Sequence, residues 1–135
     1  MGLMARTKGA QGEREISALI RDLTGWDVQR RVRNHAGDSD LVGIPGWSVE
    51  VKRHASAGRG EIAAWWRQAC EQATDGLPVL FYRLDRDSWR AVWPVSVSLT
   101  TPPVERWGGY EWTSEGSVAA WAAVARDVVP ERLCL

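Results

Sequence analysis

The stretch from residue 37 to residue 52 places two short apolar runs on either side of a turn. Asp40 precedes the first run, and Glu50 and Lys52 end the second. Residues 44–46 between them are Ile-Pro-Gly, a turn signal, so the stretch predicts a β-hairpin. Side chains alternate along a strand, so Glu50 and Lys52 share one face and the neighbouring valines share the other. Two acids and one lysine are therefore expected on a small surface with an apolar back.

The register of this hairpin decides whether the two acids meet. A three-residue loop over 44–46 places Asp40 opposite Glu50, whereas a two-residue Pro-Gly loop places them on opposite faces. We expect the three-residue loop or an equivalent bulge. Two facing carboxylates repel each other, so a cation is expected between them. This cation is either a divalent metal ion or the ammonium group of Lys52.

Length and composition indicate one soluble domain. The chain has 135 residues, of which 44% are hydrophobic and 25% are charged, which suits a single domain with a modest core. No run approaches the roughly 18 apolar residues of a membrane span, and the N-terminus lacks a signal peptide's apolar core. We therefore expect a cytoplasmic protein with no membrane partner. Cys70 and Cys134 have no metal-ligand spacing around them and are expected to be free thiols.

The net charge of the chain is zero, which argues against a strongly basic nucleic-acid binder. The distribution of charge is uneven. The first 60 residues contain ten Lys and Arg against seven acids, and the remainder contains seven against ten. The excess of three positive charges in the first part favours an anionic partner, although only weakly.

The N-terminal part predicts a helix followed by a strand. Apolar residues at helical spacing predict a helix over 11–24, with Glu13 on its buried stripe, and the residues before Gly9 are expected to be frayed. An acid in the first turn is also favoured by the helix dipole alone. Alternation predicts a strand over 26–33, in which Arg30 is half-buried and needs a carboxylate or phosphate partner.

The remaining elements complete a mixed sheet flanked by helices, which is an α/β fold. Nearly all of the nine tryptophans are expected in the core or an interface, and Trp65 or Trp66 is the best candidate for stacking on unpaired bases. The expected order is a basic loop over 53–60, a helix over 61–74, paired strands over 78–84 and 89–93, a segment over 94–99 that fits a strand or a helical turn, a loop over 100–109, and an Ala-rich helix from Ser114 or Ser117 to about Val129.

Four pieces of the sequence resemble the PD-(D/E)XK nuclease superfamily, and within it the archaeal-type and phage Holliday junction resolvases. They are KGAQGERE at 8–15, GWDVQR at 25–30, DLV at 40–42 and EVK at 50–52. The resemblance is carried by their order, by the secondary structure predicted at each, and by the acid on the first helix. It covers the first half closely and implies a restriction-endonuclease-like core in a single domain over 1–135.

This resemblance implies a metal-dependent DNA endonuclease that hydrolyses phosphodiester bonds. Asp40 and Glu50 would bind Mg²⁺ or Mn²⁺ together with the main-chain carbonyl of Val51, and Glu13 would complete or support this set. Lys52 would orient the attacking water and stabilise the transition state. Carboxylates without a Cys/His set also disfavour zinc.

The resemblance further implies a homodimeric Holliday junction resolvase of DNA recombination and repair, acting on four-way junctions. Phosphate contacts position DNA without reading its sequence, so structure-selective cutting is expected. The Ala-rich helix and surplus tryptophans are candidates for the dimer interface. A nuclease of this fold acting on other DNA, such as a restriction-like, flap-cutting or phage DNA-processing enzyme, and a non-catalytic DNA-binding module are the alternatives. The expected DNA contacts are Lys8, Arg14, Arg30, Arg31, Arg33, Arg53 and Gln68.

Two further residues near the hairpin compete for a role in the site. Asp38 is the nearest alternative to Asp40, which we prefer because it directly precedes the apolar strand. His35 is close enough in sequence to serve the site, although loop histidines are more often simply solvated.

Overall fold

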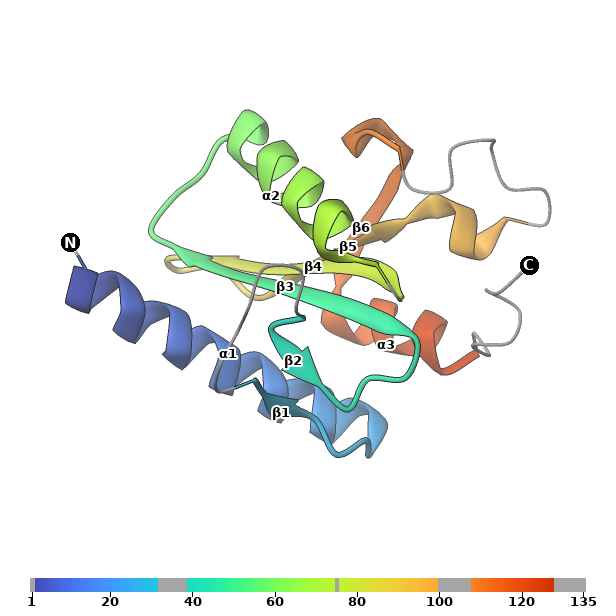
Figure 1. The fold of residues 1–135 in the computed structure, drawn as a ribbon, viewed down its shortest axis with the longest axis horizontal. Helices are drawn as coiled ribbons and strands as arrows, with labels where there is room; N and C mark the ends of the chain where they lie inside the picture. Colours follow the sequence, from blue (N-terminus) through green and yellow to red (C-terminus); the bar gives the residue numbers. More distant parts are fainter. Residues whose placement is uncertain (1, 32–38, 75, 100–107, 128–135) are drawn as a thin grey trace.

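The computed structural model describes residues 2–31, 39–74, 76–99 and 108–127, and for residues 2–8 it describes the backbone only. A four-stranded sheet has helices on both faces, and a two-stranded sheet lies beside one edge (Figure 1). This is the predicted α/β architecture. In chain order the elements are α1 (Gly2–Thr24), β1 (Gln29–Arg30), β2 (Leu41–Val42), β3 (Trp47–His54), α2 (Arg59–Gln72), β4 (Leu77–Leu84), β5 (Arg90–Pro94), the 3-10 helices η1 (Val95–Ser98) and η2 (Tyr110–Trp112), β6 (Thr113–Ser117) and α3 (Val118–Asp127).

The larger sheet has the strand order β3-β4-β5-β6, with β3 at one edge. Strands β3 and β4 are parallel and are connected by α2, whereas the other two pairs are antiparallel. In this register Glu50 lies beside Leu80, and Lys52 lies beside Tyr82. The edge strand therefore carries the two charged residues of the predicted site.

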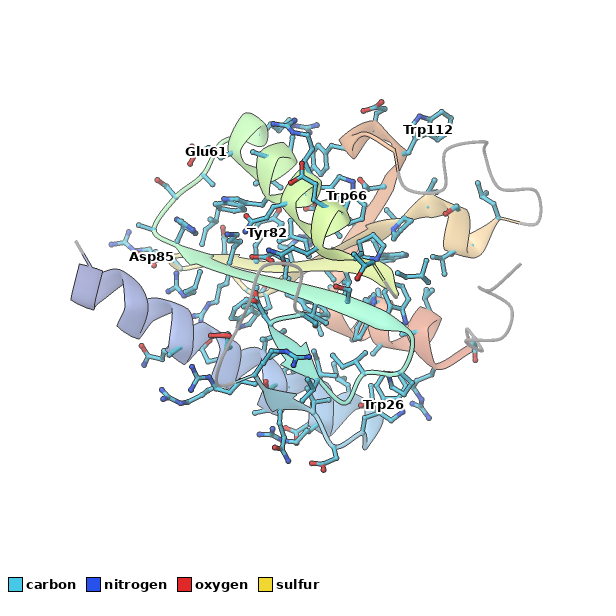
Figure 2. The ribbon with its side chains drawn as sticks, viewed as in Figure 1. Trp26, Glu61, Trp66, Tyr82, Asp85 and Trp112 are labelled. Carbon is cyan, nitrogen blue, oxygen red and sulfur yellow. The ribbon has the colours of Figure 1, made fainter. Side chains whose placement is uncertain are left out.

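Two apolar clusters cover the two faces of the sheet. The α1–α3 side contains Ile16, Phe81 and Trp121, and the α2 side contains Trp66 and Tyr82 (Figure 2). Neighbouring residues of β4 alternate between the two clusters, as expected for a strand buried on both faces. Each cluster fixes one layer of helices against the sheet.

This alternation also fixes the side on which the predicted site residues lie. Val49 is buried on the α1–α3 side. Glu50 and Lys52 pair with Leu80 and Tyr82, which belong to the α2 side. The prediction that the acid and the lysine share one face, with valines on the other, is confirmed.

Helix α1 is longer than predicted at its N-terminus. It begins at Gly2 rather than at residue 11, so the expectation of a frayed end before Gly9 is wrong. The added residues are mainly good helix formers and include no proline, and each of the two glycines among them costs only about 1 kcal/mol. The other end agrees with the prediction: Gly25 has a φ of 77° and its N–H donates to the carbonyl of Arg21 at 2.8 Å.

The predicted hairpin takes a different form. Strand β2 pairs with β1 rather than with β3. The turn is closed by the N–H of Trp47 donating to the carbonyl of Ile44 at 3.3 Å, with Gly46 at a φ of 82°. This is a two-residue Pro-Gly turn, so the predicted three-residue loop is wrong. Gly43, whose φ is 92°, lies between β2 and this turn.

Several element boundaries also differ from the prediction. Within the described residues 26–31 of the predicted strand 26–33, β1 covers Gln29–Arg30, which pair with the two residues of β2. Helix α2 starts two residues earlier, at Arg59. Residues 95–98 form a 3-10 helix, which settles the ambiguity over 94–99.

The polar segment Thr113–Ser117 forms β6, which the sequence did not predict. It becomes a strand by pairing with β5 and not through an apolar pattern of its own. Helix α3 then starts at Val118, and the hydroxyl of Ser117 accepts from the N–H of Ala120 at 3.1 Å. Ser117 rather than Ser114 is therefore the cap. None of the helices in the described ranges combines the length and the apolar character needed to cross a membrane.

Gly43 offers a direct test of this chain path. A Cβ there would collide with the carbonyl oxygen of Asp27, and its φ is in the region that disfavours other residues. Gly43→Ala should lower the free energy of unfolding by about 2 kcal/mol or more. Gly9→Ala is the matched control: nothing lies within 4 Å of its Cβ position, so it should raise stability by up to about 1 kcal/mol. Urea unfolding measures both, and equal effects would contradict the chain path at Gly43.

Candidate active site

The predicted catalytic residues come from three parts of the chain and meet at the outer edge of β3. Glu13 lies on α1, Asp40 directly precedes β2, and Glu50 and Lys52 lie on β3. Asp40 is close enough to raise the pKa of both Glu13 and Glu50, and Lys52 lowers that of Glu50. The structure therefore brings the four residues into one electrostatic group.

Asp40 is attached to β3 by two hydrogen bonds. The N–H of Val51 donates to Oδ2 of Asp40 at 2.8 Å, and the N–H of Asp40 donates to the carbonyl of Val49 at 2.8 Å. These bonds replace the regular ladder that a hairpin would have formed here. As a result, the Asp40 carboxylate is held beside Glu50 even though the turn is a two-residue one.

Ser39 completes this attachment, and sequence reasoning missed it. Its hydroxyl accepts from the N–H of Val49 at 2.9 Å and donates to the carbonyl of Leu41 at 2.6 Å. Its own carbonyl accepts from Nε of Arg31 at 2.9 Å. The one sequence signal for this role is a serine directly before Asp40. It can be interpreted only when β3 is known to lie beside residues 39–40.

Glu50 is the most strongly perturbed acid of the group. Its residue is 4% exposed, Oε1 lies 3.3 Å from Nζ of Lys52, and Oε2 is buried with no hydrogen-bond partner in the structure. Burial first, and then the charge of Asp40, raise the pKa of Glu50 to about 7, while Lys52 opposes the shift. The site therefore holds more negative charge than its own lysine can neutralise.

Glu13 and Arg30 form the second charged pair of the site. Nη2 of Arg30 lies 3.7 Å from Oε1 of Glu13, so the half-buried arginine has the carboxylate partner that its position predicted. Burial and the charge of Asp40 raise the pKa of Glu13, and Arg30 lowers it. The Glu13 carboxylate is thus shared between an arginine and the acid cluster.

Gly12 allows α1 to bring Glu13 this close to β3. A Cβ at Gly12 would lie 3.0 Å from Cβ of Arg53 and 3.4 Å from the ring of Trp89. A side chain at Gly12 would require Arg53, Trp89 or α1 to shift by a few tenths of an ångström at the residue before Glu13. This close approach explains the glycine physically.

The other predicted DNA contacts have different positions. Arg14 is exposed and lowers the pKa of Glu13, and Gln68 is half-buried on α2. Nη1 of Arg53 pairs with Oδ1 of Asp85 at 2.7 Å and also donates to main-chain carbonyls, so this arginine connects β3 to the end of β4. Lys8 (its side chain), Arg33, His35 and Asp38 lie outside the described residues.

The tryptophans are mostly structural, as predicted. Trp66 is fully buried and its Nε1 donates to the carbonyl of Gly108 at 3.2 Å, so base stacking by Trp66 is wrong. Trp65 is only partly buried and stacks on the ring of His54, with centroids 4.6 Å apart. Of the two candidates, Trp65 alone stays available for such a role.

A family model described as "Phage putative PDDEXK endonuclease" matches residues 4–107. The chain belongs to this family. The four-stranded mixed sheet flanked by helices is the restriction-endonuclease-like core that the resemblance implied. A search of curated proteins found no match. Among solved structures, the chain is similar to Hjc of Archaeoglobus fulgidus, described as a Holliday junction resolvase, with 18% identity, 90% of this chain and 98% of that chain covered, and a TM-score of 0.49.

Superfamily nucleases generally use divalent metal ions, and the residues of this endonuclease fit such an ion. Within the described ranges, no three His, Cys, Asp or Glu side chains form a ready-made metal group. The carboxylates of Asp40 and Glu50 supply hard oxygen atoms, which suit an ion that keeps several waters. The buried, unpartnered Oε2 of Glu50 and the raised pKa of this residue are both relieved by a cation.

The raised pKa of Glu50 predicts a pH-dependent stability in the presence of EDTA. Folded Glu50 keeps its proton up to about pH 7, whereas in the unfolded chain it loses the proton near the ordinary pKa of 4.5. The free energy of unfolding should therefore fall by about 3 kcal/mol between these pH values and level off above them. Urea unfolding between about pH 4 and pH 8 measures this. Glu50→Gln should remove most of the dependence and leave the part that the raised pKa of Glu13 contributes, whereas the exposed control Glu71→Gln should leave the whole dependence unchanged. A wild-type profile in Glu50→Gln would show that Glu50 titrates normally.

Ser39→Ala tests the attachment to β3. The change leaves the N–H of Val49 without its acceptor, which should cost about 1–2 kcal/mol in the free energy of unfolding. The exposed Ser98→Ala is the control and should be neutral within about 0.5 kcal/mol. Chemical denaturation compares the two variants, and a neutral Ser39→Ala would mean that the hydroxyl is dispensable.

Proposed function

We propose that this chain is a metal-dependent, structure-selective DNA endonuclease whose catalytic residues are Glu13, Asp40, Glu50 and Lys52. The observation that carries the proposal is the meeting of Asp40, Glu50 and Lys52 at one edge strand, with Glu50 holding a raised pKa and an unpartnered oxygen. Strongly perturbed acids gathered at one place are typical of catalytic sites.

Mg²⁺, or Mn²⁺ in its place, would be held by Asp40, Glu50 and the main-chain carbonyl of Val51, with Glu13 supporting the set. When bound, the ion supplies positive charge for the phosphate and makes a water more acidic. The chain contributes oxygen atoms that are already positioned, because Asp40 is fixed to β3 through the N–H of Val51.

Lys52 would act on the attacking water and on the phosphate. Its side chain is 21% exposed and its ammonium lies 3.3 Å from Glu50, so it is held in place and still accessible to a ligand. A fixed positive charge at this position stabilises the extra negative charge of the transition state. Hydrolysis breaks one P–O bond of the backbone, and the water supplies the new oxygen.

The proposed substrate is branched DNA, in first place the four-way junction. Arg14, Arg30 and Arg31 would hold phosphates around the site, with Lys8, Arg33, Arg53 and Gln68 as further contacts, and phosphate contacts select shape rather than sequence. Junction cutting of this kind would serve DNA recombination or repair in the cytoplasm of a bacterial or phage-infected cell, by a single domain over residues 1–135.

Paired nicks across a junction require two active sites, so we propose a homodimer. The outward side of α3 carries exposed alanines at 119, 120 and 123, which suits close packing against a second copy. Trp121 of the same helix is fully buried within its own subunit. Trp121 is therefore not available to an interface. Among the described tryptophans, Trp112 is the one with a large exposed fraction, 44%.

Cutting assays on a set of labelled DNAs test this function. The purified protein is incubated with Mg²⁺ and a four-way junction, a flap, a single strand or a linear duplex. Symmetric paired nicks confined to the junction support a resolvase, and cutting confined to flaps supports the alternative nuclease. Equal cutting of the linear duplex would contradict structure selectivity, and DNA binding without cutting in Mg²⁺ or Mn²⁺ would favour a non-catalytic module.

Two substitutions test the site itself. Asp40→Asn removes a metal-binding charge and Lys52→Ala removes the cation, so each should lower the cleavage rate at least about 100-fold while DNA affinity changes little. Asp127→Asn, at an exposed position on α3, is the matched control and should cut at the wild-type rate. A wild-type rate in either of the first two variants would show that the site is elsewhere.

A further inference from the structure

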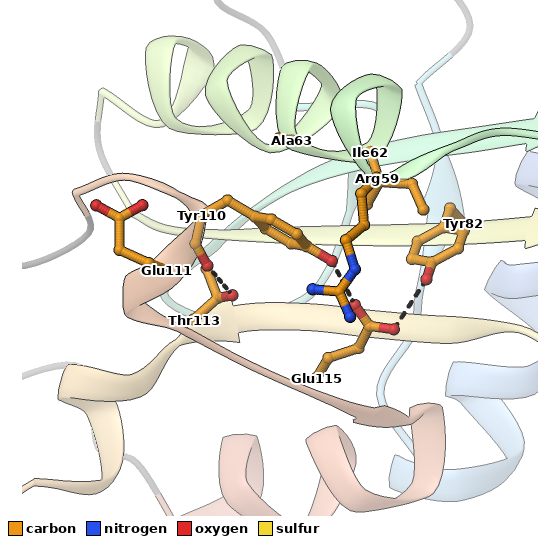
Figure 3. Close-up of a pocket in the computed structure, with 8 residues that line it drawn as sticks. All are labelled: Arg59, Ile62, Ala63, Tyr82, Tyr110, Glu111, Thr113 and Glu115. Atoms are coloured by element: carbon orange, nitrogen blue, oxygen red, sulfur yellow. Dashed lines mark hydrogen bonds between the residues drawn. The ribbon is translucent and has the colours of Figure 1, made fainter.

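A cleft of about 800 Å³ lies on the α2 side of the sheet (Figure 3). It is bounded by the first turns of α2, which contribute Arg59 and Ile62, by Tyr82 of β4, and by Tyr110 and Glu115 on η2 and β6. It combines aromatic rings, a carboxylate and an arginine in one open hollow. None of these residues belongs to the catalytic group.

The carboxylate of Glu115 is held in place by three donors. The hydroxyls of Tyr82 and Tyr110 donate to Oε2 at 2.8 Å and to Oε1 at 3.0 Å, and Nε of Arg90 donates to Oε2 at 3.3 Å. A carboxylate has about four acceptor positions, so about one remains, on Oε1. The cleft therefore offers one fixed acceptor for a donor group of a ligand.

Arg59 supplies a positive charge at the same place. Figure 3 shows its guanidinium reaching from the start of α2 to the region of Tyr110 and Glu115. Burial and Glu115 raise the pKa of Tyr110, and the charge of Arg59 opposes this rise. The Arg59 residue is exposed, so a phosphate can approach it. An arginine next to aromatic rings suits a nucleotide, because phosphate and base are then both contacted.

The cleft lies one strand away from Lys52 of the proposed active site. Tyr82 is the register partner of Lys52 on the adjacent strand, and neighbouring strands are only about 4.8 Å apart. The ring of Trp65 contacts residues of both strands: its centroid lies 4.6 Å from that of His54 on β3 and 6.0 Å from that of Tyr82 on β4. A strand of DNA whose phosphate reaches Lys52 can therefore place a neighbouring nucleotide in the cleft.

We propose that this cleft binds one unpaired nucleotide of the DNA substrate, with the base against the partly exposed ring of Tyr110, its amino group donating to Glu115, and its phosphate on Arg59. The proposal rests on the proposed function only in taking DNA as the ligand. Adenine, cytosine and guanine carry an exocyclic amino group and thymine does not. The cleft should then raise the affinity for DNA in which one of these three bases is unpaired beside the cut, as in a flap or a partly unpaired branch of a junction.

Binding measured by fluorescence anisotropy in EDTA tests this proposal without requiring cleavage. The labelled probes are a flush duplex and the same duplex with a three-nucleotide flap of dC or of dT. The wild-type chain should bind the dC flap about fivefold or more tightly than the flush duplex, and about two- to tenfold more tightly than the dT flap. Equal affinity for the flap and the flush duplex overturns the proposal that the cleft binds an unpaired nucleotide. Equal affinity for the dC and dT flaps overturns the proposed role of Glu115 as acceptor for the amino group.

Variants localise the effect. Arg59→Ala, an exposed change, should lower flap affinity about fivefold and leave flush-duplex affinity unchanged, and Tyr110→Ala should reduce the flap to the flush-duplex level. Arg126→Ala, exposed on α3 on the other side of the sheet, is the charge-matched control. An equal loss for both probes in Arg59→Ala shows a general electrostatic contact and overturns the proposal.

The outcomes separate this inference from the proposed function. A chain that cuts DNA but binds flap and flush duplex equally keeps the proposed function and overturns the cleft. A chain that prefers the flap but cuts no DNA in Mg²⁺ or Mn²⁺ supports the cleft and overturns the nuclease activity. A chain that binds no DNA overturns both.

Discussion

The hydrogen bonds between residues 39–40 and the outer edge of β3 are the interaction on which the site depends. β3 ends the sheet, so the N–H groups of Val49 and Val51 have no neighbouring strand in the larger sheet. The Ser39 hydroxyl and the Asp40 carboxylate accept these two donors. An exposed strand edge is normally a liability for aggregation, and here it becomes the anchor that holds an acid beside Glu50.

The electrostatics of the site follow from this anchor. Asp40 is fixed close to two other acids, and both Glu13 and Glu50 respond with a raised pKa. Such repulsion lowers stability, and it is accepted where it prepares a site for a cation. Lys52 and Arg30 offset part of it. The rest of the fold supplies the rigidity: the core on both faces of β4 holds β3 in place, and Gly12 lets α1 bring Glu13 to the cluster.

On the α2 side of the sheet, Tyr82 lies between Lys52 and the cleft that contains Glu115. Lys52 is the register partner of Tyr82, and Tyr82 reaches across the sheet to Glu115 on β6. Tyr82 is thus shared between the neighbourhood of Lys52 and the cleft at the start of α2. A nucleotide bound in the cleft would lie close to Lys52, because Tyr82 and Lys52 are adjacent on neighbouring strands.

Local patterns in the sequence determined much of this protein. The helical spacing of apolar residues gave α1 its buried face with Glu13 at the edge, the alternation in β3 separated Glu50 and Lys52 from the valines, and the order of these pieces identified the nuclease superfamily. These properties depend on neighbours within one helix or strand, where the periods of 3.6 and 2 residues fix which side chains share a face. Their meeting with Asp40 was inferred correctly, although through the wrong loop.

Tertiary structure alone decided the rest. The pairing of β2 with β1, the strand β6 made of Thr, Ser, Glu and Gly, and the bridging role of Ser39 all depend on partners distant in sequence. A backbone donor or acceptor takes whichever partner the packed chain brings near, and a polar segment carries no pattern that shows this in advance. The sequence by itself therefore determined which residues could do the chemistry, and the packing of β3, α1 and the approach to β2 decided how they are held together.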